Sequence, residues 1–234
     1  MPPFGFSRVV FLSHVLAGGT PVFPGDPPVL IEPAATIDAN GYFLHRVTFG
    51  EQSGTHWAAP AHITPGEATA DQLDAADFIL PAVVLDARAQ AAADPDYAVT
   101  VTDVQRWETS CGRIPEHAAV LLWSGYDERW NDAAAYLGTD RQGGLHYPGF
   151  SPQAARWLVA ERDIGALGTD TMGVDPGADT TFAANAILLR GHRIHLENLC
   201  GLGELPASGG WIVVGGVRVA GGSGSPATVL GLVP

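Results

Sequence analysis

Three short apolar segments separated by helix-forming stretches constrain the fold of this chain more than any other feature. They span residues 81–86, 118–123 and 164–167, and each is short and continuously apolar. Runs of this kind form strands that are buried on both faces of a sheet. Helices are expected between them, one with a threonine cap over residues 102–112 and one that opens at Ser151-Pro152. This alternation predicts an α/β architecture.

Hairpin signals toward both ends of the chain add further strands. Residues 29–37 and 42–49 are two candidate strands joined by an Asn-Gly turn, the dipeptide most typical of tight hairpins. Residues 211–219 and 227–233 are also strand-like. The glycine-rich segment 221–226 between them lacks the lysine and the following helix of a phosphate loop, so a tight turn is expected there. Together with the buried runs, these signals predict a mixed sheet.

Composition limits the domain organisation and the classes of partner. With 46% hydrophobic residues, 16% charged residues and no long polar linker, residues 1–234 are expected to form one domain. The net charge is −13, and all twelve basic residues are arginines scattered along the chain. Because no basic stripe exists to neutralise phosphates, neither a nucleic acid nor a membrane is expected as a partner.

Cysteine usage and the absence of targeting signals predict a cytoplasmic protein. Cys111 and Cys200 lie far apart and form no CxxC motif, so reduced thiols are the simpler interpretation. The first residues lack the charged and apolar regions of a signal peptide. No apolar run reaches the roughly 18 residues that a membrane span requires.

Residues with acid/base and metal-binding capacity are concentrated in the segment 51–62. Its twelve residues include a glutamate, a glutamine, a tryptophan and two histidines, His56 and His62. Gly54 and Pro60 argue against a regular helix through this segment. Since the chain is otherwise poor in charge, this concentration indicates a catalytic or ligand-binding loop.

Several motifs in the chain resemble those of the cyclase/kynurenine formamidase family. Gly54-Thr55-His56 and Pro60-x-His62 fit the family pattern His-x-Gly-Thr-His-x-Asp-x-Pro-x-His, and Leu196-Glu197-Asn198-Leu199 fits a later motif. Similar stretches also occur at residues 22–28, 146–149 and 168–171, so the resemblance covers nearly the whole chain. It implies a single-domain swivelling β/α/β fold with a mixed sheet flanked by helices. It also implies a homodimer or homotetramer that hydrolyses amides or lactones, or closes rings, with a divalent metal site in many members.

Carried over by position, the metal ligands of this family fall on six residues of the chain. They are Gln52, His56, Ala58, His62, Asn185 and Glu197. Gln52 stands in place of the first histidine, Ala58 in place of the bridging aspartate and Asn185 in place of a later histidine. Two neighbouring divalent ions repel each other and need a bridging anion, and alanine offers no donor atom. A dinuclear centre is therefore not expected.

Two interpretations of the surviving ligands stay open. In the first, His56, His62 and Glu197 hold one zinc or manganese ion, and the enzyme hydrolyses a small amide, imide or lactone. In the second, no metal is bound, and an imidazole paired with Glu197 acts as a general acid and base in ring closure or dehydration. His62, Glu197 and His56 are the candidate catalytic residues in both. A relative that binds a ligand without turnover is a third interpretation.

Six residues are candidate contacts for a small-molecule substrate. They are Gln52, Thr55, Trp57, Asn185, Tyr126 and His146. Polar members of this set could donate hydrogen bonds to a developing oxyanion, whereas Trp57 fits the core as well as substrate stacking. The other histidines have no partner by spacing and are expected at the surface or in structural roles; they are His14, His45, His117, His192 and His195.

Overall fold

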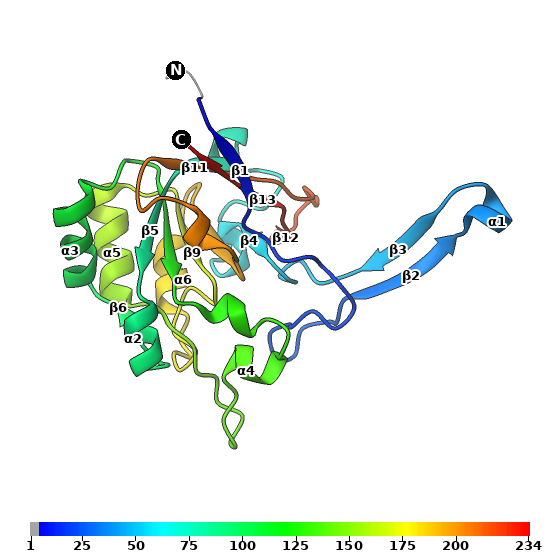
Figure 1. The fold of residues 1–234 in the computed structure, drawn as a ribbon, viewed down its shortest axis with the longest axis horizontal. Helices are drawn as coiled ribbons and strands as arrows, with labels where there is room; N and C mark the ends of the chain where they lie inside the picture. The colour runs from blue at the N-terminus through cyan, green and yellow to red at the C-terminus, as the bar shows by residue number, and fades with distance from the viewer. Residues whose placement is uncertain (1–4) are drawn as a thin grey trace.

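A computed structural model describes residues 5–234 of the protein. A nine-stranded mixed sheet lies at its centre (Figure 1). Its strands are β1 (Arg8–Phe11), β4 (His56–Ala58), β5 (Ile79–Asp86), β7 (Ala119–Trp123), β9 (Ala166–Thr169), β10 (Ile194–Glu197), β11 (Gly210–Val214), β12 (Gly224–Pro226) and β13 (Val229–Val233). They follow one another in the order β1-β13-β11-β5-β7-β9-β10-β4-β12. The four strands β5, β7, β9 and β10 run parallel, and the strands on either side of them are antiparallel.

The predicted buried strands form the parallel centre of this sheet. On β5, Val83 and Leu85 pack into the core on one face, and Ala82 and Val84 pack into the core on the other. Burial on both faces explains why the sequence of this strand is continuously apolar rather than alternating. The predictions for residues 81–86 and 118–123 are confirmed, and the short strand predicted at 164–167 begins two residues later.

Helices pack against one face of the sheet. They include α2 (Arg88–Ala93), α3 (Val101–Cys111), α5 (Pro152–Arg162) and α6 (Ala183–Leu188). Ser151 caps α5 through its hydroxyl oxygen, as predicted. The helix expected over residues 102–112 begins one residue earlier, because Thr100 and Asp103 form a capping box that fixes its start.

The glycine-rich segment near the C-terminus is an edge strand rather than only a turn, which corrects the prediction from sequence. Residues Gly224–Pro226 form β12 and pair antiparallel with β4. A Cβ atom on Gly224 would lie 2.3 Å from the carbonyl oxygen of Trp57, so only glycine permits this close backbone approach. The strand predicted at 211–219 ends earlier, at Val214, and the chain then turns back toward β4.

A long two-stranded arm projects from the body (Figure 1). It consists of β2 (Leu30–Ala35) and β3 (Leu44–Thr48), which pair antiparallel, so the predicted hairpin is confirmed. Its tip is one helical turn, α1 (Ile37–Asn40), which Thr36 caps and Gly41 ends with a φ of 77°. This tip replaces the two-residue turn that the Asn-Gly dipeptide favours.

Shorter elements complete the fold. They are α4 (Ala133–Leu137), the strands β6 (Ala98–Val99) and β8 (Gly149–Phe150), and the 3-10 helices η1 (Pro60–His62), η2 (Ala75–Phe78), η3 (Tyr126–Arg129) and η4 (Leu202–Glu204). Within residues 5–234, no helix is long and apolar enough to cross a bilayer. Strand β8 pairs parallel with β6, and it lies against the backbone that follows β9.

Substituting Gly149 tests the packing that supports the back of the candidate site. A Cβ atom at this position would lie 2.4 Å from the carbonyl carbon of Asp175 and from the nitrogen of Pro176, which are backbone atoms. We expect Gly149→Ala to lower the free energy of unfolding by about 1–3 kcal/mol in urea titrations. Gly18→Ala is the matched control, because nothing lies within 4 Å of a Cβ there. Equal midpoints for the two variants would contradict the packing described.

Candidate functional site

Two short antiparallel strands, β4 and β10, carry the centre of the candidate site. Their register sets His56 opposite Glu197 and Ala58 opposite His195. Because successive side chains of a strand point to opposite faces, these four residues share one face of the sheet. Trp57 lies on the opposite face, in the apolar core. The predicted residues His56 and Glu197 are therefore brought together as neighbours across the two strands.

Glu197 is a buried carboxylate held by its neighbours. Its Oε1 accepts a hydrogen bond from the backbone N–H of Val174 at 3.0 Å and lies 3.4 Å from Nδ1 of His195. Its Oε2 lies 3.2 Å from Nε2 of His56. Burial alone opposes ionisation, but His195 and His56 outweigh it and lower the pKa of Glu197 to about 2. The site therefore contains a negative charge at neutral pH.

The orientation of His56 directs its Nε2 at this carboxylate. Its Nδ1 lies 2.9 Å from the carbonyl oxygen of Gly54, which only accepts hydrogen bonds, so Nδ1 carries a proton. Asn198 donates to the same carbonyl oxygen at 2.7 Å and holds it in place. In the neutral ring, Nε2 and the Glu197 carboxylate are thus two acceptors 3.2 Å apart. Such a pair is stable only with a proton or a cation between the two atoms.

His195 is the main residue that the sequence prediction placed wrongly. It was expected at the surface or in a satisfied structural role, but it is buried in the site, and burial lowers its pKa to about 3. Its ring centroid lies 5.5 Å from that of His56 and 5.8 Å from that of His62. A signal was present in the sequence, because residues 195 and 197 of one strand necessarily share a face.

Asn185 orients His195 through a buried chain of hydrogen bonds. Its Nδ2 donates to the Asp175 carboxylate at 2.9 Å, so its Oδ1 is the atom that faces His195 Nδ1 at 2.6 Å. Nδ1 of His195 is therefore the protonated nitrogen, and Nε2 has a lone pair. Nε2 is buried and has no hydrogen-bond partner among the described residues. Asn185 also lines the pocket, and its hydrogen bond with Nδ1 positions the ring of His195.

His62 lies at the mouth of the site and is exposed, outside the compact group of His56, His195 and Glu197. Desolvation in the pocket lowers its pKa from 6.5, so the ring is neutral at physiological pH. Gln52 lies beside it, with Nε2 of Gln52 3.4 Å from Nδ1 of His62. The same Nε2 donates to Ser223 at 3.1 Å, and Oε1 of Gln52 is buried and has no hydrogen-bond partner within residues 5–234.

A pocket of about 240 Å³ opens onto these polar groups. One wall contains the rings of Phe23 and Phe182, whose centroids are 6.2 Å apart. Ile63, Met172 and Tyr147 also line it. An apolar wall with a small number of convergent polar groups is the usual composition of a small-molecule site.

Thr55 and Trp57 do not line this pocket, although both were predicted to contact substrate. The hydroxyl of Thr55 donates to the carbonyl oxygen of Asn198 and accepts from the backbone N–H of His14 at 2.9 Å. Trp57 is buried in the core, where its ring packs edge-on against that of Phe78 with a centroid distance of 4.8 Å. The strand alternation that directs His56 into the site directs both of its neighbours away from it.

Tyr126 and His146 also lie outside the pocket lining. Nδ1 of His146 is 2.9 Å from the Asp96 carboxylate, and Nε2 is 3.3 Å from that of Asp140, so hydrogen bonds to both carboxylates raise its pKa. Tyr126 is buried and donates to the carbonyl oxygen of His146 at 3.3 Å. These contacts hold the loop between α4 and β8, and they keep both side chains outside the pocket lining.

The donor set fits one divalent cation and does not fit two. Ligand atoms of His56, His195 and Glu197 all lie within 4.8 Å of one another, and all three residues are buried. Two imidazoles and a carboxylate are ligands typical of hydrolytic zinc or manganese sites, and the unpartnered lone pair of His195 favours a cation. Ala58 offers no donor to bridge a second ion. A second acidic group, Asp74, Asp77 and His192, is more exposed and does not line the pocket.

Comparisons with known proteins agree with this fold. Residues 10–176 match the family model described as putative cyclase. An isatin hydrolase of Roseibium aggregatum is 33% identical over 98% of this chain and 93% of its own length. A kynurenine formamidase of Salinibacter ruber is 26% identical, with 93% and 94% covered.

Solved structures extend the similarity to the whole architecture. Isatin hydrolase A from Ralstonia solanacearum superposes with a TM-score of 0.91 at 34% identity, covering 97% of this chain and 92% of that one. An isatin hydrolase bound to the product analogue thioisatinate gives 0.92 at 32% identity, with the same coverage. The fold and the matched relatives define a hydrolase of small carbonyl compounds. The chain belongs to the cyclase family.

The tautomer of His195 tests the hydrogen-bond chain through Asn185. We expect long-range ¹H–¹⁵N NMR spectra of the metal-free protein to show His195 protonated at Nδ1, because Asn185 Oδ1 accepts from that atom. Asn185→Leu removes the acceptor, so the tautomer preference is expected to weaken. Arg190 lies on the exposed surface just beyond α6, and Arg190→Ala serves as the control. A wild-type ring protonated only at Nε2 would rule out the arrangement.

Proposed function

We propose that this protein hydrolyses the amide or imide bond of a small cyclic carbonyl compound that contains a flat ring. One observation carries the proposal: the buried group of His56, His195 and Glu197 faces a pocket with an aromatic wall. Hydrolysis of an amide requires polarisation of the carbonyl, a proton acceptor for water and a proton donor for the leaving nitrogen. The pocket has side chains suited to each task.

The relatives support a ring amide as the substrate class. Isatin is a planar bicyclic compound with a lactam, and the isatin hydrolase of Roseibium aggregatum matches the chain over nearly its full length. The rings of Phe23 and Phe182 offer apolar faces for such a ring system. The cavity of about 240 Å³ suits a molecule of this size rather than a polymer.

A single zinc or manganese ion would be held by His56, His195 and Glu197. A divalent cation in this position would supply Lewis-acid polarisation of the substrate carbonyl. The backbone N–H of Val174 and the hydrogen bond from His195 to Asn185 hold two of these side chains in place. Support for one ion comes from Nε2 of His195, which is buried and has no hydrogen-bond partner among the described residues, and from Nε2 of His56, which lies 3.2 Å from the Glu197 carboxylate.

His62 has the properties of the proton-transfer residue. It is neutral, because desolvation lowers its pKa, and it lies at the pocket mouth, where water enters. In the proposed reaction it accepts a proton from water as the C–O bond forms, and it returns a proton to the nitrogen as the C–N bond breaks. Gln52 supports its orientation and leaves its own Oε1 free to accept an amide N–H of the substrate.

Ring closure or dehydration without a metal is the second candidate function. It is favoured by the distance of 3.2 Å between His56 and Glu197, since a protonated His56 would form an ion pair with this carboxylate. Such a pair supports acid/base chemistry without activation of water.

A cytoplasmic location accords with either function, because neither Cys111 nor Cys200 forms a disulfide.

Activity of two site variants tests the proposed hydrolysis. We expect His62→Ala and Glu197→Gln each to lower kcat/KM for isatin hydrolysis by about 10²–10⁴-fold, followed by absorbance. His192→Ala is the control, because His192 is exposed and contacts only Asp74 and Asp77 among charged groups. Wild-type rates in either site variant would contradict the assigned roles. If the wild-type protein has no hydrolase activity on any ring amide tested, the proposed function fails.

Metal content tests the proposed cation independently of turnover. We expect elemental analysis and calorimetric titration with Mn²⁺ or Zn²⁺ to give one ion per chain. His195→Ala should weaken the affinity by about 10–100-fold, because it removes a ligand. His146→Ala, in a histidine outside the pocket, should leave it unchanged. Two ions per chain would contradict the donor analysis, and an active protein with no measurable binding would favour the second candidate.

A further inference from the structure

Carboxylates line the pocket, and no permanently charged basic side chain accompanies them. They belong to Asp26, Asp175, Asp179 and Glu197. The chain contains no lysine, and within residues 5–234 none of its arginines lines the pocket. A cleft lined by one sign of charge concentrates ligands of the opposite sign. The charge of the lining therefore affects which substrates the pocket accepts.

Two of these carboxylates are occupied by contacts inside the protein. Asp175 accepts hydrogen bonds from the backbone N–H of Asn185 at 3.1 Å and from its side-chain amide at 2.9 Å. Glu197 accepts from the backbone N–H of Val174 and lies against the ring of His56. Both carboxylates are buried. They belong to the closed end of the pocket and are already satisfied there.

The other two carboxylates keep oxygen atoms that have no hydrogen-bond partner in the described part of the chain. Asp26 is exposed, and its side chain accepts no hydrogen bond within residues 5–234. Asp179 is half-buried, and its Oδ1 accepts from the backbone N–H and the hydroxyl of Thr181 at 2.7 and 2.6 Å, which leaves Oδ2 free. Desolvation lowers the pKa of His62, and the charge of Asp26 is among those that act against it. Asp26 thus lies near the pocket mouth, where His62 is.

Each free carboxylate comes from the same short segment as one ring of the aromatic wall. The backbone N–H of Asp26 donates to the carbonyl oxygen of Phe23 at 3.0 Å and closes a turn between the two residues. Asp179 is bonded to Thr181, which directly precedes Phe182. The centroids of the two phenylalanine rings are 6.2 Å apart. The open end of the pocket therefore combines two aromatic rings with two unneutralised carboxylates.

This combination is the one that proteins use to bind an organic cation. The face of an aromatic ring attracts an ammonium group, and carboxylates supply charge and hydrogen-bond acceptors. We propose that Asp26 and Asp179 select the substrate by charge, so that the pocket prefers a ring amide carrying a protonated amine toward the mouth and rejects one carrying an acidic group. This preference rests on the proposed function, which supplies the ring amide.

The charge of the remaining protein acts in the same direction. The chain has a net charge of −13, so its field attracts cations toward the pocket and repels anions from it. A cation held by His56, His195 and Glu197 would offset charge at the closed end of the pocket. Asp26 and Asp179 belong to the open end and are not among those ligands. They are therefore the residues that determine the charge preference at the mouth.

Calorimetric binding of three probes tests this preference. The probes are oxindoles, flat ring amides that resist hydrolysis, with an aminomethyl, an ethyl or a sulfonate group on the ring carbon opposite the nitrogen. The aminomethyl group is protonated at neutral pH, the ethyl group has nearly the same shape without the charge, and the sulfonate is negative. We expect the wild type to bind the aminomethyl probe at least about tenfold more tightly than the sulfonate probe at about 20 mM salt, with the ethyl probe between them.

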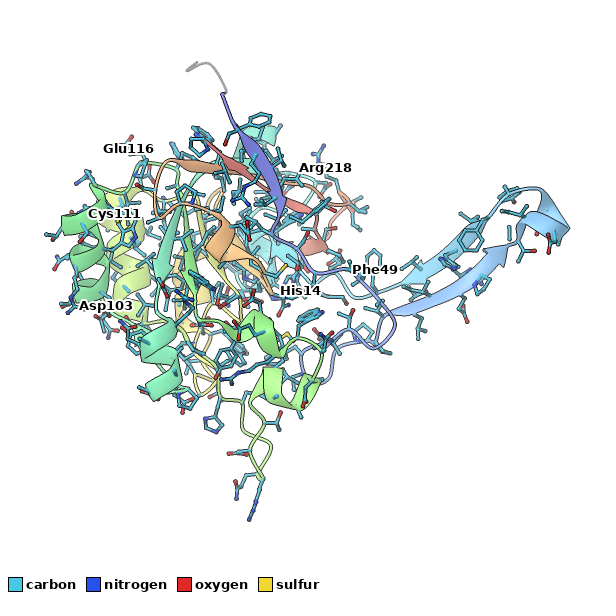
Figure 2. The ribbon with its side chains drawn as sticks, in the orientation of Figure 1. His14, Phe49, Asp103, Cys111, Glu116 and Arg218 are labelled. Carbon is cyan, nitrogen blue, oxygen red and sulfur yellow. The ribbon has the colours of Figure 1, made fainter. Side chains whose placement is uncertain are left out.

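Two double variants assign the preference to its residues. Asp26→Asn/Asp179→Asn should reduce the ratio of the two affinities by at least about threefold, because both charges are lost while asparagine still accepts from Thr181. Glu116→Gln/Glu161→Gln removes the same number of charges from exposed positions outside the pocket lining and should leave the ratio unchanged. Figure 2 shows Glu116 at the end of the body opposite the arm.

The outcomes separate this proposal from the proposed reaction. Equal affinities of the wild type for the three probes, or a preference for the sulfonate, would overturn the charge selection. A ratio that Asp26→Asn/Asp179→Asn leaves unchanged, or that both double variants lower equally, would overturn the role of these two residues. Because the probes are not hydrolysed, a protein that has the expected ratio but no hydrolase activity would reject the reaction and support the charge selection.

Discussion

The antiparallel pairing of β4 with β10 is the interaction on which the candidate site depends. Its register sets His56 against Glu197 and Ala58 against His195, on the face that opens into the pocket. A slip of one residue would turn these groups away and bring Trp57 and Leu196, which lie in the core, toward the pocket. On its other edge β4 is held by β12, which approaches closely because it begins with glycine. The chemistry of the protein thus rests on two strands of three and four residues near the edge of the sheet.

The substitutions in the site become intelligible when Ala58 and Asn185 are considered together with His195. In the family that the chain resembles, an aspartate at the position of Ala58 and a histidine at the position of Asn185 ligate metal. This chain has neither of these two ligands. His195 stands directly across from Ala58, and its ring lies between His56 and His62. Asn185 accepts a hydrogen bond from Nδ1 of this ring and so orients it. Ala58 offers no donor that could bridge two ions, whereas His56, His195 and Glu197 are three buried residues whose ligand atoms lie within 4.8 Å of one another.

Much of the fold could be predicted from the sequence, because strands buried on both faces leave continuous apolar runs such as residues 119–123. His56 and Glu197 were identified from their motifs. The spacing between histidines does not reveal His195, whereas its two-residue separation from Glu197 indicates that both side chains share one face of a strand. The contact between Asn185 and His195 depends on how α6 packs beside β10, which no local pattern encodes. The loop that holds Tyr126 and His146 away from the pocket follows a path set by side-chain contacts with Asp96 and Asp140.

We propose that His56, His195 and Glu197 together hold one cation. Anomalous diffraction from crystals grown with Mn²⁺ or Zn²⁺ tests it most directly, because the peak reports the position of the ion without reference to activity. We expect one peak per chain within about 2.1–2.3 Å of nitrogen atoms of both histidines and of a Glu197 oxygen. Two peaks in the pocket, or one peak ligated by His62 with His195 turned away, would contradict it.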